Sequence, residues 1–359
     1  MMTRPPSANA HRIEPIDALR ALALLAVVVV NFSGYDEVFN GGVLPSPQDE
    51  DGALVWAVSV LVLALLQGKG IALLTFLFGY SLTLGGFAPG RLNRLLGLGL
   101  LHGFLLYLGD IVSQYALAGR WLTRWRRWRC GRILRRARLW LIVGIVLSLG
   151  SVPYMGAPAA AVPDAGPTLA DWAEPTAWWF ENASGYLSYL VAMLTVGWPW
   201  TIGLVAFGLL AGRLRLLSHR RWRPMMARAA RWALPMLLLQ WVWAAWTAES
   251  QLVDHAGWSM TLHSLFGAAA MLTWVPWLIL HVRRWPTLLV LAGRQTLTPY
   301  LLCSFVTVAL WCNWAVGWRP GVLEGYAAGA LLWFALMMLS AWATRRGQRL
   351  PAEAWLAKR

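Results

Sequence analysis

The chain has 359 residues, of which 58% are hydrophobic and only 13% are charged, and its formal net charge is +15. Since a soluble protein usually carries about 25% charged residues, this composition predicts an integral membrane protein. The arginines gather in clusters between apolar runs, as cytoplasmic loops beside an anionic inner leaflet do, so the charge does not indicate a nucleic-acid partner.

The first apolar run covers residues 16–34 and follows a tail of residues 1–15. Glu14 and Asp17 abut this run, and no small-x-small cleavage site precedes Gly34. The run is therefore interpreted as a permanent membrane helix and not as a cleaved signal peptide.

The next apolar stretch, residues 54–86, is interrupted by Gln67-Gly68-Lys69-Gly70. Two full crossings in this stretch would place the following arginine-rich loop outside the cell, against the positive-inside rule. The sequence therefore predicts one net crossing, with 54–66 as an interfacial or re-entrant helix on the outer side and 70–86 as the span. Lys69 is then expected near the outer boundary of the membrane.

The apolar blocks further along the chain predict eight more spans, which gives ten crossings with both termini inside. The acidic stretches 35–52 and 153–185 contain no Lys or Arg and are expected outside. The arginine clusters within 120–138 and 213–231 are expected in the cytoplasm. The eight further spans are predicted at about 95–109, 110–123, 139–153, 186–211, 232–248, 259–281, 296–316 and 322–344.

The predicted fold class is all-α: a polytopic transmembrane helical bundle of the bacterial inner membrane, with about ten spans plus one interfacial or re-entrant helix. The expected partners are the lipid bilayer and the anionic lipids of its inner leaflet, with no nucleic acid, and the oligomeric state is open. The predicted parts are a cytoplasmic N-terminal tail (1–15), an N-terminal transmembrane half (16–152), a periplasmic Pro/Ala-rich loop (153–185), a C-terminal transmembrane half (186–344) and a basic cytoplasmic tail (345–359).

Ionisable and polar side chains within predicted spans are candidates for function, because they are costly in a bilayer. Asp17 and Arg20 are three residues apart at the inner end of the first helix, so they share a face and can pair. The pair either binds a ligand or seats the helix at the interface. Asn31, near the outer end of the same helix, either contacts a ligand or forms a hydrogen bond between helices.

His102 lies in the middle of a predicted span, and Asp110 follows at the predicted outer turn. A straight helix separates residues eight apart by about 12 Å, so the two can pair directly only if the helix breaks. His102 is either a general base or a structural imidazole bonded to a neighbouring helix. No HExxH motif, P-loop or GxSxG motif occurs in the chain, and no metal site is expected.

Five groups of short motifs are spread along nearly the whole chain. They are Arg12-Ile13-Glu14-Pro15-Ile16-Asp17-Ala18-Leu19-Arg20 with Val30-Asn31, Gly68-Lys69 with Leu74-Thr75-Phe76-Leu77-Phe78-Gly79, Leu101-His102-Gly103 with Gly109-Asp110-Ile111 and Tyr115-Ala116-Leu117, Gly293-Arg294-Gln295-Thr296-Leu297-Thr298-Pro299-Tyr300-Leu301, and Leu350-Pro351-Ala352-Glu353-Ala354-Trp355-Leu356. In this order they resemble the motifs of the YeiB-like family, bacterial multi-spanning membrane proteins that contain a domain of unknown function. The chain departs from that family at Pro299, where Asn is usual, and at Leu350-Pro351, where Gly-Pro is usual.

The YeiB-like family is in turn similar to membrane acyltransferases that move acyl groups onto extracytoplasmic sugars. Those enzymes often carry an Arg in the first helix, followed after ten residues by a catalytic His. Arg20 occupies the first of these positions here, but Asn31 occupies the second. Because an amide cannot act as a general base near pH 7, the resemblance implies a relocated base, for which His102 is the candidate.

Three functions remain open from the sequence. The first is an acyltransferase, in which His102 and Asp110 are catalytic, acyl-CoA is the candidate donor, and Asp17, Arg20, Asn31 and Lys69 bind substrate. In this hypothesis Arg20 and the basic loops attract the donor, whereas Lys69 and Asp110 hold the acceptor at the outer surface. The second is a transporter of a small polar or anionic solute along a path through the same residues. The third is a non-enzymatic membrane protein in which these residues only join helices.

Overall fold

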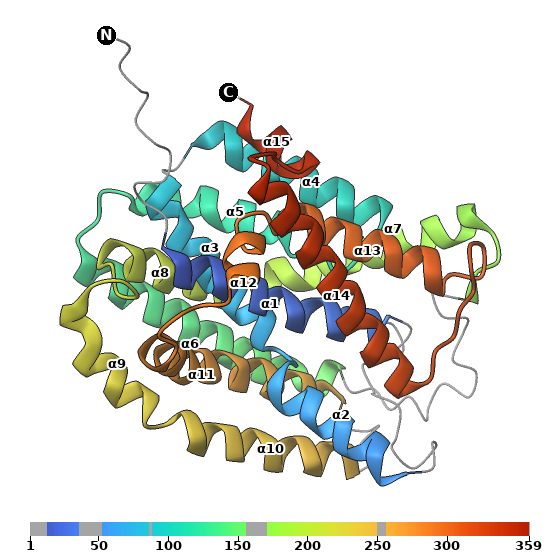
Figure 1. The fold of residues 1–359 in the computed structure, drawn as a ribbon, viewed down its shortest axis with the longest axis horizontal. Helices are drawn as coiled ribbons and strands as arrows, with labels where there is room; N and C mark the ends of the chain where they lie inside the picture. The colour runs from blue at the N-terminus through green and yellow to red at the C-terminus, as the bar shows by residue number, and fades with distance from the viewer. Residues whose placement is uncertain (1–12, 36–51, 86–87, 156–170, 250–255, 359) are drawn as a thin grey trace.

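A computed structural model describes residues 13–35, 52–85, 88–155, 171–249 and 256–358, and every regular element in these ranges is a helix (Figure 1). The all-α prediction is therefore confirmed. The main helices are α1 (Glu14–Ser33), α2 (Ala53–Leu65), α3 (Lys69–Gly85), α4 (Pro89–Leu105), α5 (Val112–Leu122), α6 (Cys130–Met155), α7 (Pro175–Ala192), α8 (Trp198–Arg213), α9 (Arg223–Ala230), α10 (Ala233–Glu249), α11 (Ala256–His281), α12 (Thr287–Ala292), α13 (Leu297–Trp311), α14 (Val322–Arg345) and α15 (Pro351–Ala357).

Helix α1 lies inside the bundle, between α3, α12, α13 and α14. Its apolar residues are distributed around the whole helix, and most of them are buried. A helix that is apolar on all sides is stable only when other apolar groups surround it. Figure 1 accordingly shows α1 behind α14 and beside α12 and α3.

The outer helices expose apolar side chains, which is the reverse of a soluble protein and fits contact with lipid. On α10 and α14 these exposed side chains recur every three or four residues, so each helix has one lipid-facing stripe. The stripes contain Leu234, Leu238 and Val242 on α10, and Leu331, Phe334, Met338 and Trp342 on α14.

Four stretches of the described residues are long and apolar enough to cross a bilayer. Two shorter apolar helices, Leu265–His281 and Leu297–Trp311, accompany them. The fold is thus a helical membrane bundle, and the count of ten crossings stays a prediction. The four stretches are Glu14–Ser33, Ala53–Leu84, Pro175–Arg213 and Val322–Arg345.

Charged residues gather at two ends of the bundle. At the first, called the basic end below, Arg213 donates hydrogen bonds to the backbone carbonyl oxygens of Trp125, Arg126 and Trp128, which joins the end of α8 to the loop before α6. The last helices also reach this end, where Arg94 of α4 donates to the carbonyl oxygen of Leu356. The described acidic residues at the opposite end include Asp171, Glu174, Glu181 and Glu324.

Helices α2 and α3 follow one another in the same direction, with a break between Leu66 and Gly68 (Figure 1). They do not fold back as a re-entrant hairpin, and Ala53–Leu84 forms one apolar stretch of 32 residues. This arrangement fits the single net crossing predicted for the stretch. Gly68 has a φ of +74°, a conformation that glycine adopts without strain because it has no Cβ. This explains why the break falls there.

Helices α4 and α5 form a hairpin whose turn lies inside the protein. The return arm α5 has 11 residues, so it is about 16 Å long, roughly half the thickness of the bilayer core. Leu92 at the start of α4 and Leu122 at the end of α5 pack in one cluster, so both arms meet the basic end. The segments predicted as spans at 95–109 and 110–123 thus form this hairpin, and whether each arm crosses the bilayer stays a prediction.

The loop predicted at 153–185 ends earlier than expected, because helix α7 already begins at Pro175. A π-helical turn at Met193–Gly197 joins α7 to α8, whose second residue, Pro199, has no backbone N–H to donate. Pro175–Arg213 is therefore one long helical unit that reaches from the opposite end to the basic end.

Helices α3 and α8 pack closely because glycines line their contact. A Cβ at Gly208 would lie 2.0 Å from the carbonyl oxygen of Phe76, and one at Gly79 would lie 2.0 Å from that of Val205. Gly208 and Gly212 form the GxxxG spacing that lets membrane helices approach closely. This contact fixes α3 beside α5 and α8, in the wall of the site described next.

Candidate functional site

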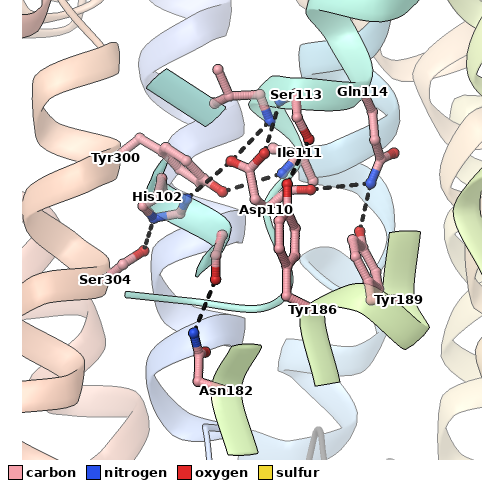
Figure 2. A network of polar contacts seen from close by, with 12 residues as sticks. His102, Asp110, Ile111, Ser113, Gln114, Asn182, Tyr186, Tyr189, Tyr300 and Ser304 are labelled. Carbon is pink, nitrogen blue, oxygen red and sulfur yellow. Dashed lines mark hydrogen bonds and ion pairs between the residues drawn. The ribbon is translucent and has the colours of Figure 1, made fainter. Parts of the chain in front are cut away.

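His102 and Asp110 form a direct dyad inside the α4–α5 hairpin. The imidazole Nδ1 lies 2.9 Å from the carboxylate Oδ1, and both side chains are almost completely shielded from solvent (Figure 2). The two residues that the sequence marks as catalytic candidates are therefore brought together. The condition set by the sequence, a break in the helix, is met, because α4 ends at Leu105 and α5 begins at Val112.

The carboxylate of Asp110 is held by the first turn of α5. The backbone N–H of Val112 donates to Oδ1 at 3.1 Å, and that of Ser113 donates to Oδ2 at 2.8 Å. These N–H groups are the unpaired donors of a helix N-terminus, where the helix dipole also favours negative charge. An ionised carboxylate can only accept hydrogen bonds. The Nδ1 of His102 therefore carries the proton and is the third donor to Asp110.

Ser304 of α13 extends the dyad on its far side. The serine Oγ lies 2.9 Å from His102 Nε2, so the order of contacts is Ser304, His102, Asp110 (Figure 2). With the Nδ1 proton directed at Asp110, Nε2 carries a lone pair and accepts a hydrogen bond from the serine hydroxyl. Ser304 is buried, with 5% of its surface exposed.

A shell of tyrosine and amide side chains surrounds this network (Figure 2). Tyr300 lies over the imidazole with ring centroids 5.0 Å apart, and its hydroxyl accepts from the N–H of Ile111 at 3.4 Å. Gln114 donates to the carbonyl oxygen of Asp110 and to the hydroxyl of Tyr189. Further bonds run from Tyr186 to Ser113 and from Asn182 to the carbonyl oxygens of Gly103 and Phe104.

A layer of aromatic residues covers the dyad on the side of the opposite end. Tyr35 follows α1 and stacks on Tyr107 in the hairpin turn, with centroids 6.2 Å apart. Trp178 donates to the hydroxyl of Tyr35 at 3.3 Å. Trp311 also packs against Tyr35. This layer separates the dyad from the region of Asp171 and Glu174.

A cavity of about 920 Å³ lies on the other side of the dyad and reaches the basic end. The dyad itself does not line this cavity: Tyr300, which covers the imidazole, and Ile111, whose N–H bonds to Tyr300, lie between the two. Tyr300 and Ile111 pack in one cluster with Val28 of α1, which lies about 16 Å along that helix from Asp17. The cavity is thus apolar at its inner end. Its cationic residues lie toward the basic end: Arg20, Arg91, Arg94, Arg294, Arg349 and Lys358.

Asp17 and Arg20 pair at 3.0 Å at the mouth of this cavity, so the pairing predicted from their spacing is found. Arg20 also donates to the hydroxyl of Ser81. Arg294 lies 3.8 Å from the second oxygen of Asp17. The carboxylate therefore joins two arginines that line the cavity.

Asn31 and Lys69 are not brought to the dyad in the described part of the chain. Lys69 is buried at the break between α2 and α3, where its ammonium group donates to the carbonyl oxygen of Leu63 at 2.9 Å. Asn31 is partly exposed and precedes Phe32, whose ring packs in the aromatic cluster with Tyr35. Neither residue lines the cavity. Their substrate-binding roles stay predictions. Asp49, expected at the outer surface, lies outside the described residues.

No group of three or more His, Cys, Asp and Glu side chains among the described residues is close enough to hold a metal ion. The carboxylate of Asp110 instead accepts two backbone N–H groups and the imidazole. The dyad is therefore arranged for proton transfer, since its base and the group that orients the base are in hydrogen-bond contact.

Ser304 and Tyr300 were missed when site residues were predicted. Tyr300 stands in a motif of the family resemblance, but Ser304 stands in the apolar stretch Leu301-Leu302-Cys303-Ser304-Phe305 with no neighbouring polar residue. It is 202 positions from His102, so no local spacing could reveal the contact. The only sequence signal is a hydroxyl residue within a membrane helix, which usually has a structural role.

The C-terminal part of the chain, residues 211–359, matches the family described as "Protein of unknown function (DUF418)". Over nearly its full length the chain is similar to YeiB of Escherichia coli (strain K12), with 27% identity in an alignment that covers 95% of this chain and 94% of that protein. It is also similar to YxaH of Bacillus subtilis (strain 168), with 27% identity over 171 residues that cover 43% of this chain and 41% of that protein.

These similarities confirm the resemblance to YeiB-like proteins predicted from the motifs. Both relatives are described as uncharacterized, and their descriptions state no activity. The similarity to membrane acyltransferases therefore stays a prediction. No solved structure matches the chain.

Removing the carboxylate of Asp110 is expected to destabilise the fold. Asp110→Ala leaves the donors of His102, Val112 and Ser113 without their acceptor, and hydrogen bonds to charged groups contribute about 1.5–3 kcal/mol each. We expect the free energy of unfolding to fall by about 3 kcal/mol or more, and by less for Asp110→Asn, which keeps one oxygen acceptor. Unfolding by SDS in mixed micelles measures both values.

Asp171→Ala is the control for this experiment. Asp171 is an exposed carboxylate that pairs with Arg319 at 2.8 Å, and such pairs contribute about 1 kcal/mol or less. An Asp110→Ala protein as stable as the Asp171→Ala protein would contradict the structural importance of the dyad.

Proposed function

We propose that this protein is a membrane-embedded acyltransferase that takes an anionic acyl thioester donor, such as acyl-CoA, from the cytoplasm. One observation carries the proposal: the His102–Asp110 dyad lies directly behind Tyr300 and Ile111, which line the apolar inner end of a large cavity with arginines at its mouth. A general base held by a buried carboxylate is the arrangement used for acyl transfer in water-excluded sites.

The charge and shape of the cavity fit an amphipathic donor. Six cationic side chains line it, whereas the carboxylate that lines it, Glu353, accepts hydrogen bonds from Leu297 and Thr298. Arginine groups bind phosphate oxygens in bidentate fashion, so the mouth suits the phosphates of a nucleotide-bearing thioester. The apolar inner end, with Leu24, Leu74 and Val112, suits the acyl chain.

The basic end is assigned to the cytoplasm in this proposal, and both termini lie there. The positive-inside rule supports this orientation, because the arginine-rich connections before α6 and around α9 are short. The acceptor is a hydroxyl compound that approaches from the opposite, periplasmic end through the aromatic layer of Tyr35, Tyr107 and Trp178.

A small-solute transporter is the second candidate, and the interrupted helices favour it. Transporters bind solutes where helices break at membrane depth. The α4–α5 turn is such a break, and Asp110 lies in it. However, the dyad connects to a hydroxyl through His102 Nε2, as acyl transfer requires and solute binding does not.

The orientation is tested by labelling single cysteines in a background without Cys130, Cys303 and Cys312. We expect a membrane-impermeant maleimide to label cysteine introduced at Asp171 in intact spheroplasts. Cysteines introduced at Arg126 and Arg221 should react only after lysis, since the basic end faces the cytoplasm. Labelling at position 126 before lysis, with position 171 protected, would reverse the orientation.

His102→Gln tests the catalytic assignment. Glutamine keeps hydrogen-bonding capacity toward neighbouring helices, and such bonds in membranes average about 0.6 kcal/mol, so the variant should fold and insert. We expect release of free coenzyme A from acyl-CoA to fall by about 10²- to 10⁴-fold, the usual loss for a general base. Thiol release by protein purified in detergent, followed with a thiol reagent, measures the rate.

His281→Gln is the matched control, because His281 is exposed at the end of α11, where Nδ1 pairs with the carbonyl oxygen of Trp277. It should leave the rate of thiol release unchanged. Wild-type turnover by the folded His102→Gln protein would exclude His102 as the base.

A further inference from the structure

We propose that Ser304 is the nucleophile of this site and carries the acyl group as a covalent ester between two half-reactions. The proposal rests on the acyltransferase function proposed above and adds to it a residue and an intermediate. Its basis is the contact order of Ser304 Oγ, His102 and Asp110, with 2.9 Å at each of the two hydrogen bonds.

The hydroxyl of Ser304 is used differently from other hydroxyls in the helices. Within a helix, Ser and Thr usually donate back to the carbonyl oxygen four residues earlier. Thr307 of the same helix does this toward Cys303 at 2.8 Å, and Thr75 of α3 does it toward Ile71. In the described part of the chain Ser304 instead bonds to His102 Nε2.

The direction of this hydrogen bond makes Ser304 the group that His102 deprotonates. The carboxylate of Asp110 accepts the Nδ1–H of His102, which leaves Nε2 as an acceptor. The donor to Nε2 is the O–H of Ser304, so a hydroxyl of an incoming acceptor could reach Nε2 only by displacing it. The serine oxygen is therefore the first nucleophile that the base can activate.

Ser304 does not itself line the cavity, so a donor must displace the ring of Tyr300 to reach it. Ser304 follows Tyr300, which lines the inner end of the cavity, by four residues and thus by about 6 Å along α13. The hydroxyl of Tyr300 accepts from the N–H of Ile111, and its own proton has no acceptor among the described residues. This proton can be donated to the negative oxygen that develops on the thioester carbonyl.

The first half-reaction forms the serine ester. Ser304 Oγ bonds to the carbonyl carbon of the thioester while its proton moves to His102 Nε2. The carbon–sulfur bond breaks, and the thiolate leaves with the proton from His102 as free thiol. In the second half-reaction an acceptor hydroxyl gives its proton to His102 and bonds to the same carbon. The ester bond to Ser304 breaks, and Ser304 regains the proton.

The experiment uses the full-length protein in detergent with acetyl-, octanoyl- and palmitoyl-coenzyme A as probes. Acid-quenched protein is examined by intact mass and peptide mapping, and thiol release is followed in parallel. We expect wild-type protein to gain the mass of one acyl group on Ser304. Ser304→Ala should gain none and should lose thiol release by about 10²-fold or more. Ser304→Cys should hold the acyl group as a thioester that neutral hydroxylamine cleaves.

Thr307→Ala is the matched control, since Thr307 is buried on the same helix but bonds only its own backbone in the described residues. It should retain both thiol release and the covalent acyl group. Wild-type thiol release by Ser304→Ala overturns the assignment of Ser304 and leaves the proposed function standing. An inactive Ser304→Ala with no acyl group on wild-type or Ser304→Cys protein also overturns it, because Ser304 then only orients His102. No thiol release by wild-type protein from any probe overturns the proposed function itself.

Discussion

The site depends on one constraint, the need of a buried carboxylate for hydrogen-bond donors. Asp110 has no solvent exposure, and an unpaired charge in such a place would cost several kcal/mol. The break after Leu105 meets this need, because it exposes the first N–H groups of α5 beside the carboxylate and brings His102 within 2.9 Å. A continuous helix would separate the two side chains by about 12 Å and leave both without these partners.

The α4–α5 hairpin can exist inside the bundle only because the neighbouring helices α7 and α13 pair its polar groups. The turn is free of the lipid, where unpaired backbone groups are not tolerated, since α7 and α13 cover it with polar side chains. Close contacts at glycines allow this covering. A Cβ at Gly103 would lie 2.1 Å from the ring of Tyr186, and one at Gly99 would lie 2.3 Å from the backbone nitrogen of Ser113. The small residues on α4 therefore set how near the polar shell comes to the dyad.

The position of the hairpin also divides the interior into two unlike halves. Toward the basic end the cavity is lined by apolar groups and then by arginines, and toward the opposite end aromatic rings are packed tightly. The proposed donor and acceptor would therefore approach the imidazole from different sides, the donor past Tyr300 and the acceptor past the aromatic layer. Burial also strengthens the electrostatic effect of Asp110 on His102, because the effective dielectric constant inside a protein is low.

Much of the fold could be predicted from the sequence because apolar runs, their charged flanks and their lengths obey the physics of a bilayer. The helices α1, α10 and α14 agree with the predicted spans to within two residues at each end. The hairpin was predicted less well, because α4 and α5 have the apolar composition of two separate spans. Only the length of α5, which is 11 residues, distinguishes it from a full span. Asp110 was expected at the surface for the same reason.

The candidate site could be predicted only in part. His102 and Asp110 stand out because ionisable groups are rare in membrane helices, and Asp17 with Arg20 stand out by their spacing. Ser304 gave no such signal, because its role comes from a contact with a helix 202 positions away in sequence. Lys69 was expected beside Asp110 from depth alone. The depth of a residue in the bilayer does not determine which way its side chain points. The ammonium group of Lys69 donates to the carbonyl oxygen of Leu63 instead.

The central claim is that the cavity delivers an acyl thioester donor to the His102–Asp110 dyad. It is tested most directly by cryo-electron microscopy of the protein with a thioether analogue of acyl-CoA, which cannot transfer its acyl chain. The account predicts density in the cavity, with the phosphates beside Arg91 and Arg294 at the mouth and the end that replaces the acyl group beside Tyr300 and His102. A cavity that stays empty at saturating analogue, or analogue bound at another surface, would contradict the claim.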